Sequence, residues 1–294
     1  MLVLVSAASL GSLGVLGKIA YGQGLTIATV LALRFTIGSL AFFAILGIAQ
    51  TWKRATCTTG DGNSDRSLAI LRGRKLYVAI ALGALGYGVM SGLFFWGLRY
   101  MSAGMVAIAF YTYPVFVILI SSTVLREKIT KYTVIALLFA FCGVTLITGL
   151  DRASADPRGM IIVLTSALIF AAYVTVSRAV LAEVDARVLT AHVLSSAAIT
   201  FIIYGSVTSQ LSFPSTMNGW IAGVLLGVVA TAIPVFAFLA GLSRIRATRA
   251  SILMTFEPVV AVLLGSALLG DPISWVTVVG GGLVLAATVL IHRT

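Results

Sequence analysis

Residues 249–274 read RASILMTFEPVVAVLLGSALLGDPIS, a run of apolar and small residues in which Glu257 stands directly before Pro258. Because lipid chains offer no hydrogen bonds, an apolar segment of this length predicts a membrane-spanning helix. A carboxylate inside such a helix costs about 2.5–3.5 kcal/mol on insertion scales, so it should face a cavity or a partner. The stretch therefore predicts a membrane helix that carries a polar site.

The composition extends this interpretation to the whole chain. Its 294 residues are 60% hydrophobic and 10% charged, and the mean hydropathy is +1.09. A soluble domain has about 25% charged residues, so this chain has too few charges to cover a water-facing surface. The net charge is +11, but the basic residues gather between apolar runs as orientation signals do, so we expect no nucleic-acid partner. The expected fold class is an all-α integral membrane protein in the lipid bilayer.

Ten apolar runs are long enough to cross a hydrocarbon core of about 30 Å, which takes about 20 residues each. They are residues 2–21, 26–49, 76–98, 102–125, 130–149, 158–181, 187–209, 217–242, 248–270 and 272–291. The first run has no basic region before it, so we expect a retained helix and not a signal peptide. The connections are short apart from the polar stretch 50–75, which predicts one compact bundle of ten transmembrane helices.

The distribution of Lys and Arg predicts how the bundle is oriented. With the N-terminus inside, the loops on the outer side hold only four bases, and most of the others fall on the cytoplasmic side. The outer four are Lys18, Arg99, Arg152 and Arg158. This bias predicts a multi-pass protein of the inner (plasma) membrane with both termini in the cytoplasm.

An internal repeat organises the ten spans. When the chain is shifted by 144 residues, spans 3–5 fall on spans 8–10 without a gap, so that Pro114 meets Pro258 and Glu127 meets Asp271. Each half then holds five spans, an odd number, so the halves must point in opposite directions through the membrane. We expect two inverted five-helix repeats, residues 1–150 and 151–294. Secondary transporters are commonly built this way, with a site near the midplane between the halves.

Three segments carry a family resemblance: IATVLALRFTIGSLAF (27–42), SAGMVAIAFYTYPVFVILISSTVLREKIT (102–130) and RASILMTFEPVVAVLLGSALLGDPIS (249–274). With its Arg-containing second span, mid-helix prolines and acidic turns, the chain resembles the drug/metabolite transporter superfamily in its ten-helix EamA-like branch. It departs from the pattern in Asp271, where Glu is usual. The resemblance implies alternating-access transport of small metabolites, often export (efflux) of amino acids or related compounds.

Two charged residues lie deep within predicted spans. Glu257 either binds a proton or substrate during transport, or makes a structural hydrogen bond to carbonyl groups freed by Pro258. Arg34 in span 2 either binds a substrate carboxylate, for which a guanidinium is suited, or extends toward the outer headgroups. The two lie at similar depths from opposite sides, so a direct Arg34–Glu257 pair is a further alternative.

Three prolines, Pro114, Pro234 and Pro258, lie inside predicted spans. Each proline removes a backbone hydrogen bond and bends its helix. One interpretation is that the bend is a hinge or exposes a carbonyl group to the substrate. The alternative is a fixed kink that only helps the helices to pack.

Aromatic residues supply the remaining candidates for substrate contact. Tyr111 and Tyr113 lie beside Pro114, Tyr87 lies in span 3, and the repeat sets Tyr113 opposite Glu257. Trp96 is a candidate as well, although its place near the end of span 3 also fits an interfacial aromatic belt.

The sequence contains no HExxH, GxSxG, phosphate-loop or CxxC motif, so we expect neither an enzyme nor a cofactor or metal. The alternative is an integral-membrane enzyme or lipid-handling protein that uses Glu257 as a general base. The expected partners are a small-molecule substrate and protons as a coupling ion, with the chain a monomer or a homodimer.

Overall fold

The computed structural model describes residues 1–56, 71–149, 156–270 and 272–291, and side chains only outside 49–56. Most of the polar stretch 50–75, Asp271, and the boundary between the expected halves therefore lie outside what is described.

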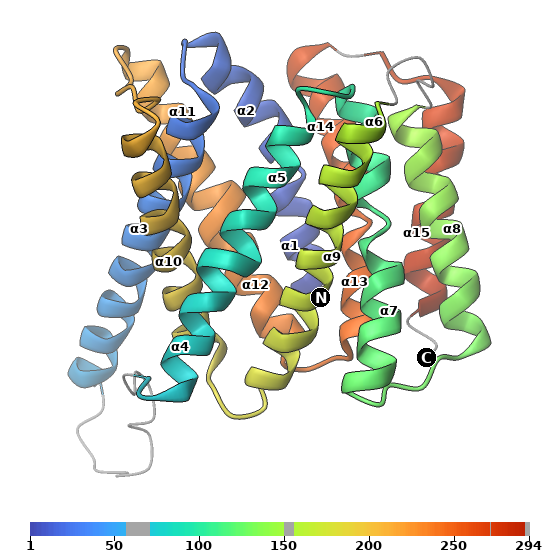
Figure 1. Cartoon of the computed structure of the whole chain (residues 1–294), viewed down its shortest axis with the longest axis horizontal. Helices are drawn as coiled ribbons and strands as arrows, with labels where there is room; N and C mark the ends of the chain where they lie inside the picture. Colours follow the sequence, from blue (N-terminus) through green and yellow to red (C-terminus); the bar gives the residue numbers. More distant parts are fainter. Residues whose placement is uncertain (57–70, 150–155, 271, 292–294) are drawn as a thin grey trace.

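Over the described residues the only regular secondary structure is helical, and Figure 1 shows the helices side by side. In chain order they are α1 (Leu2–Leu10), α2 (Leu13–Gly22), α3 (Ile27–Thr56), α4 (Arg74–Ala81), the π-helical η1 (Leu82–Val89), α5 (Met90–Gly97), α6 (Ala103–Phe110), α7 (Tyr113–Val124), α8 (Lys131–Thr148), α9 (Pro157–Val180), α10 (Ala186–Val207), α11 (Met217–Gly227), the π-helical η3 (Val228–Ala232), α12 (Ile233–Leu242), α13 (Ala247–Met254), α14 (Glu257–Leu269) and α15 (Trp275–Ile291).

Joined end to end, these helices give nine segments in the described residues that are long and apolar enough to cross a membrane. The tenth predicted run, 272–291, forms the shorter apolar helix Trp275–Ile291. Its first residues belong instead to the turn before the helix, where Pro272 has no N–H to give to a helical ladder. The expectation of an all-α membrane protein is confirmed.

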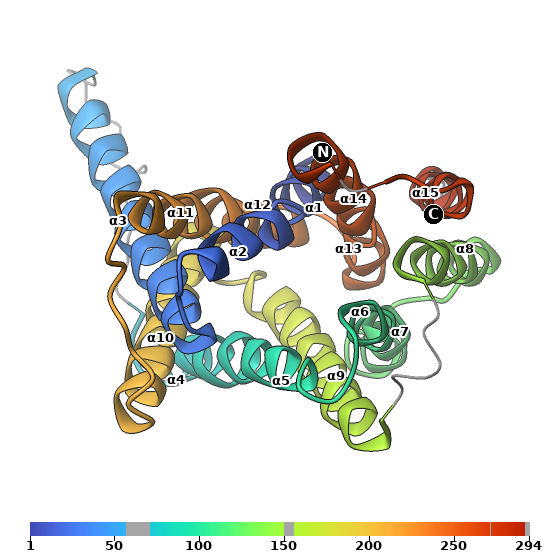
Figure 2. The same ribbon diagram turned by 90° about the horizontal axis from the view of Figure 1, so that it is seen from above.

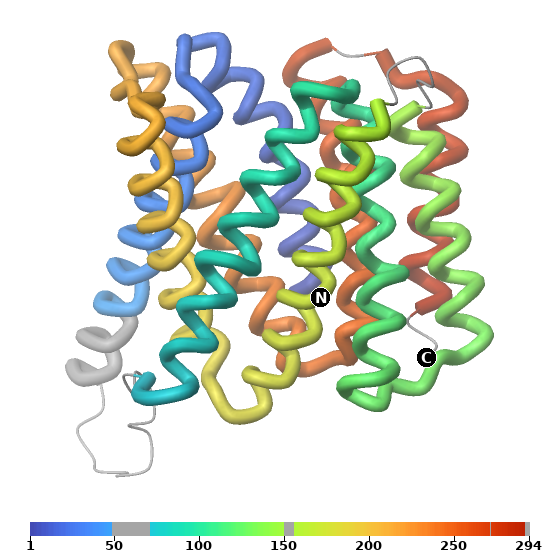
Figure 3. Tube along the Cα trace, viewed as in Figure 1, coloured from blue at the N-terminus to red at the C-terminus, as the bar shows by residue number. Residues whose placement is uncertain are grey.

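Several spans are built from two helices that meet at a break. Figure 3 shows the trace continuing through these breaks, so each pair still crosses the molecule as one unit. Figure 2 shows the view along the helices: α8 and α15 lie side by side at one end, and the other spans surround the middle of the molecule.

The helix boundaries recur at the shift of 144 residues seen in the sequence. α6 and α13 begin at Ala103 and Ala247, and the helices that follow them begin at Tyr113 and Glu257. The π-helical segments η1 and η3 overlap at the same shift, and so do α5 and α12. Figure 1 shows that the matched spans run in opposite directions: α6 and α7 descend, whereas α13 and α14 rise.

Contacts between spans also occur twice. Ser6 Oγ in span 1 donates to the carbonyl oxygen of Pro234 at 2.7 Å. Ser166 Oγ in span 6 donates to the carbonyl oxygen of Met90 at 2.8 Å. Met90 and Pro234 are the residues that the shift places on each other, so spans 1 and 8 pack as spans 6 and 3 do.

Close helix packing depends on glycines, as expected of small residues in membrane helices. A Cβ on Gly227 would lie 2.7 Å from Ile37 Cβ in α3, and a Cβ on Gly83 would lie 2.5 Å from the carbonyl oxygen of Val193 in α10. Gly83 and Gly227 are again 144 residues apart, so this close approach is repeated as well.

The turns α7–α8 (125–130), α9–α10 (181–185) and α12–α13 (243–246) lie at the lower end in Figure 1. We call this end the basic face because the turns carry or adjoin Arg126, Lys128, Lys131, Arg178, Arg187, Arg244 and Arg246. The predicted grouping of these bases on one side is therefore seen in the fold.

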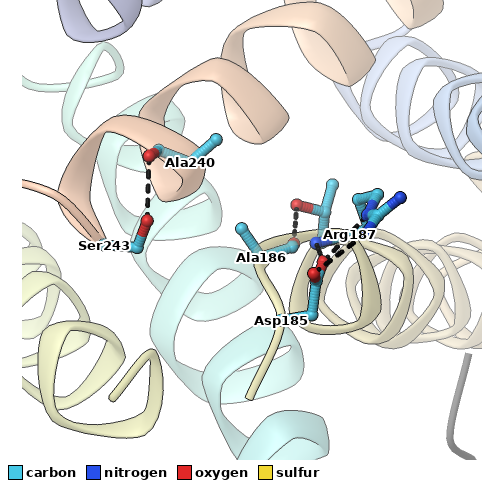
Figure 4. A network of polar contacts seen from close by, with 6 residues as sticks. Asp185, Ala186, Arg187, Ala240 and Ser243 are labelled. Carbon is cyan, nitrogen blue, oxygen red and sulfur yellow. Dashed lines mark hydrogen bonds and ion pairs between the residues drawn. The ribbon is translucent and has the colours of Figure 1, made fainter. Parts of the chain in front are cut away.

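The start of α10 on the basic face is capped by a carboxylate. Asp185 accepts hydrogen bonds from the Arg187 backbone N–H at 2.8 Å and from its Nε at 3.0 Å (Figure 4). These bonds from Arg187 hold the pKa of Asp185 below its usual value. Close by in the same view, Ser243 Oγ donates to the carbonyl oxygen of Ala240 at 2.9 Å, at the end of α12. Both contacts satisfy helix-terminal backbone groups.

Candidate functional site: a central cavity between Arg34 and Glu257

A cavity of about 630 Å³, its opening included, lies among the spans. It is lined by Leu10, Leu13, Arg34, Tyr87, Met90, Ser91, Phe94, Phe95, Phe110, Tyr111, Tyr113, Phe170, Met254 and Glu257. Ligand sites typically combine an apolar and aromatic wall with a few polar groups, and this lining has that character. Five residues singled out from the sequence line it together: Arg34, Tyr87, Tyr111, Tyr113 and Glu257.

Arg34 is held in the wall by groups from two other spans. Its side chain is only 2% exposed, and its Nε donates to Thr231 Oγ1 at 3.0 Å. The guanidinium also contacts the Tyr87 hydroxyl and lies over the Phe35 ring, 4.8 Å from its centroid. A buried charge needs such partners, and these contacts direct Arg34 into the cavity and not toward the headgroups.

The two π-helical segments position the partners of Arg34. Thr231 lies in η3, where its hydroxyl donates to the carbonyl oxygen of Leu226, five residues back, at 2.8 Å. Because that bond uses the only hydroxyl proton, the oxygen is left as an acceptor for Arg34. Tyr87 lies in η1, and residues 87 and 231 are 144 apart. Two residues related by the 144-residue shift therefore contact one arginine, and π-helical turns are frequent at functional sites.

Glu257 is the first residue of α14, and it has a different set of contacts. Its carboxyl group interacts with the Tyr111 hydroxyl through a side-chain hydrogen bond, and with Arg34 electrostatically. Arg34 and Glu257 thus share the cavity, while each has hydrogen-bonding partners of its own. A helix N-terminus favours an acidic group electrostatically, which adds to the stabilisation of Glu257 there.

Tyr113, which the 144-residue shift places opposite Glu257, points toward α13 in span 9. Its hydroxyl donates to the carbonyl oxygen of Ser251 at 3.0 Å, and its ring packs edge-on against Phe170 with centroids 4.8 Å apart. The phenol of Tyr113 therefore ties span 4 to span 9, while Tyr111 supplies the hydroxyl for Glu257.

Pro114 and Pro258 lie in the first turns of α7 and α14, each after a two-residue break in its span. At a first turn the missing proline N–H needs no partner, so each proline marks where a helix restarts. The breaks place Tyr111 and Glu257 at helix ends that face the cavity. Pro234 is the second residue of α12, which follows η3 without a break; its carbonyl oxygen is bonded to Ser6 and it does not line the cavity.

Trp96 lies outside the cavity, since it is not part of the lining and its side chain is 47% exposed. Its neighbours Phe94 and Phe95 line the cavity instead. Successive helical residues are about 100° apart, so Trp96 projects from another side of α5. This position fits the alternative of an interfacial aromatic residue.

The sequence did not reveal several residues of the site. Thr231 and Phe170 are ordinary membrane-helix residues, and only their positions mark them. For Thr231 a signal was present, because the 144-residue shift places it opposite Tyr87. For Phe170, which lies in span 6 outside the ungapped part of the repeat, the sequence offers no such signal.

A multi-span helical protein with a polar site inside an aromatic-walled cavity has the architecture of a membrane transport protein. The comparisons agree with this class. The profile described as the EamA-like transporter family matches residues 1–149 and 157–293, so the chain belongs to that family.

Relatives and a solved structure extend over most of the chain. An Archaeoglobus fulgidus protein named as an uncharacterized transporter is 30% identical over 274 residues, which are 90% of this chain and 98% of the relative. YcbK of Bacillus subtilis, also named as an uncharacterized transporter, is 26% identical and covers 74% of this chain and 73% of its own. One solved crystal structure superposes with a TM-score of 0.79 at 18% identity, covering 99% of this chain and 96% of the other. At that identity it shows the fold alone. The protein is a membrane transporter of the EamA-like family.

Proposed function

We propose that this transporter moves small amphipathic zwitterions, with amino acids that carry an apolar side chain as the best-fitting class. The observation that carries the proposal is the cavity itself, in which Arg34 and Glu257 stand within an aromatic lining. A guanidinium suits a substrate carboxylate and a carboxylate suits an ammonium group. The aromatic rings would then surround the apolar part of the substrate.

The mechanism we propose is alternating access, secondary-active or facilitative, between two inverted five-helix halves, residues 1–150 and 151–294. Support comes from helix boundaries that recur after 144 residues, from matched spans that run in opposite directions (Figure 1), and from the paired Ser6 and Ser166 contacts. The site lies where the halves meet, because Arg34 and Glu257 come from different halves.

We further propose that the basic face is cytoplasmic, with both termini on that side of the plasma membrane and export as the direction of net flux. The grouping of bases on one face supports the orientation. A single chain encloses the cavity, so a monomer suffices for transport.

Solute counterflow into proteoliposomes tests the function. Vesicles preloaded with an unlabelled compound should take up its labelled form when it is a substrate, across a panel of amino acids, amines, carboxylates, nucleosides and sugars. We expect counterflow for amphipathic zwitterions. Its absence for every compound, with correctly folded protein, would contradict the proposal.

The same vesicles test whether Glu257 couples transport to protons. Glu257→Gln keeps the shape of the side chain and removes its titration, so we expect transport that no longer varies with pH or responds to a pH gradient. An unchanged pH profile in this variant would leave Glu257 without a coupling role. Release of a chemically altered product by the purified protein would instead favour Glu257 as a general base.

A further inference from the structure

Glu127, in the turn between α7 and α8, binds the start of a helix in the other half. Its Oε1 accepts from the Ala247 N–H at 2.8 Å. Its Oε2 accepts from the Thr248 N–H at 3.1 Å and from Thr248 Oγ1 at 2.7 Å. A carboxylate that accepts several N–H groups at a helix N-terminus makes strong, charge-assisted hydrogen bonds. Glu127 is therefore the N-terminal cap of α13.

This cap is unusual because it comes from a distant part of the chain. Seven other described helices are capped by the side chain of the residue just before them: Thr26 for α3, Ser102 for α6, Thr130 for α8, Asp156 for α9, Asp185 for α10, Thr216 for α11 and Ser274 for α15. In α13 that position holds Arg246, whose side chain makes no capping bond. A local cap would stabilise α13 equally well, so the use of Glu127 indicates a role in joining the halves.

The turn that presents Glu127 is held in an uncommon conformation. Arg126 has φ of +53°, in the left-handed region that residues with a Cβ rarely occupy. The Glu127 N–H is bonded to the carbonyl oxygen of Ser121 at 3.2 Å, and Ser121 Oγ lies 3.0 Å from Thr248 Oγ1. The backbone of the turn and the side chains around it thus converge on the start of α13.

Next to this junction, on α9, two hydroxyl groups are buried without a good hydrogen bond. Tyr173 is 1% exposed and Ser177 is 0% exposed. Their oxygens face each other one turn apart, but neither makes a well-formed hydrogen bond among the described residues. A buried polar group without a partner costs about 1–3 kcal/mol, so such groups call for an explanation.

The position of the two hydroxyls supplies that explanation. Phe170 lines the cavity, and Tyr173 stacks on it with ring centroids 5.7 Å apart. Ser177 follows one turn later, and α9 ends near the basic face (Figure 1). α9 also packs against both α7 and α13, the two helices that Glu127 ties together. A line of hydroxyls therefore runs from the cavity toward the basic face, behind the Glu127 junction.

We propose that Glu127 is the latch that keeps this transporter closed on its basic face, and that the route it closes runs past Tyr173 and Ser177. The inference rests on the alternating-access function proposed above. In the closed state the latch joins the halves, and the hydroxyls of Tyr173 and Ser177 are excluded from water. When the latch opens, the halves separate and the two hydroxyls become accessible to water and substrate.

Cysteine accessibility tests the latch without any substrate. In a background with Cys57→Ser and Cys142→Ser, Ser177→Cys reports on the route and Ser91→Cys reports on the cavity. A membrane-impermeant cationic thiol reagent is added to oriented vesicles from either side. We expect Glu127→Gln to raise the labelling rate of Ser177→Cys from the basic face about tenfold, which corresponds to about 1.4 kcal/mol. Labelling of Ser91→Cys from the opposite side should fall.

Glu183→Gln is the matched control, because Glu183 is an exposed carboxylate on the same face, paired with Lys75 at 2.7 Å. It should leave both rates unchanged. Equal labelling in the two Gln variants, or no rise with Glu127→Gln, would overturn the latch.

Thr248→Ala removes one of the three hydrogen bonds to Glu127 and replaces Glu127→Gln as the test if that variant does not fold. It should raise the labelling rate of Ser177→Cys from the basic face about threefold. No rise would equally overturn the latch. If the panel compounds show no counterflow but Glu127→Gln still raises the labelling of Ser177→Cys, the substrate proposal is refuted and the latch is not.

Discussion

Gly11 lies directly against the backbone of Glu257: a Cβ placed on Gly11 would be 2.9 Å from the Glu257 carbonyl oxygen and 2.8 Å from Val260 Cβ. This contact joins the break between α1 and α2 to the first turn of α14. The position of the cavity carboxylate therefore depends on the absence of a side chain in span 1.

Gly11→Ala should destabilise the protein by about 1–3 kcal/mol, because the added methyl group forces two backbones apart in a packed interior. The melting temperature in detergent measures this effect. Gly14→Ala is the control, since a Cβ there meets nothing within 4 Å. Similar melting temperatures for the two variants would show that the close approach at Gly11 is not required.

Thr231→Val should weaken substrate binding about tenfold, because it removes the acceptor that orients Arg34, and hydrogen bonds to charged groups contribute about 1.5–3 kcal/mol. Equilibrium binding of the labelled substrate measures the change. Thr190→Val is the matched control: Thr190 is also buried, but its hydroxyl donates to the carbonyl oxygen of Ala186 in its own helix. Equal affinity in both variants would argue against a positioning role for Thr231.

Tyr111→Phe and Tyr113→Phe separate the two phenols that lie close together in the lining. Tyr111 contacts the Glu257 carboxyl group, so losing its hydroxyl should change the pH dependence of transport. Tyr113 donates to the Ser251 carbonyl oxygen, so losing its hydroxyl should lower the stability by about 1 kcal/mol. The melting temperature should fall accordingly, and the pH dependence of transport should stay unchanged. The reverse pattern would show that the two roles are wrongly assigned.

Asp185→Ala should lower stability by about 1 kcal/mol through loss of the α10 cap. Arg187 depresses the pKa of Asp185 in the folded state. The ionised Asp185 carboxylate therefore stabilises the fold fully above the unfolded carboxyl pKa of about 3.9, and this stabilisation is lost as the pH falls through the folded pKa. The melting-temperature difference from wild type should therefore shrink below about pH 4.

Asp156→Ala provides the comparison, since Asp156 caps α9 through the Arg158 N–H at 2.7 Å. Asp185 additionally accepts side-chain bonds from Arg187, so its substitution should be the more destabilising of the two. A smaller effect at Asp185 would mean that the exposed ion pair adds nothing to the cap.

The sequence predicted the fold well because apolar length and repeated prolines are local signals. The apolar lengths of the membrane helices and the helix breaks next to Pro114 and Pro258 follow from these signals directly. The site was only partly predictable. Arg34 and Glu257 stood out as charges in apolar runs, but their partners Thr231 and Tyr111 are common residues whose role depends on packing between distant spans. The sequence marks Glu127 only as an acidic residue at a turn, since nothing local reveals that it caps a helix 120 residues away.

The central claim is that Arg34 and Glu257 hold opposite ends of a zwitterionic substrate. Binding of three matched compounds tests it most directly: an apolar amino acid, the amine that lacks its carboxylate, and the acid that lacks its amine. Wild type should bind the amino acid tightest. Arg34→Gln should lose the preference for a carboxylate and still bind the amine, whereas Glu257→Gln should lose the preference for an amine and still bind the acid. If both variants bind all three compounds as wild type does, the claim is contradicted.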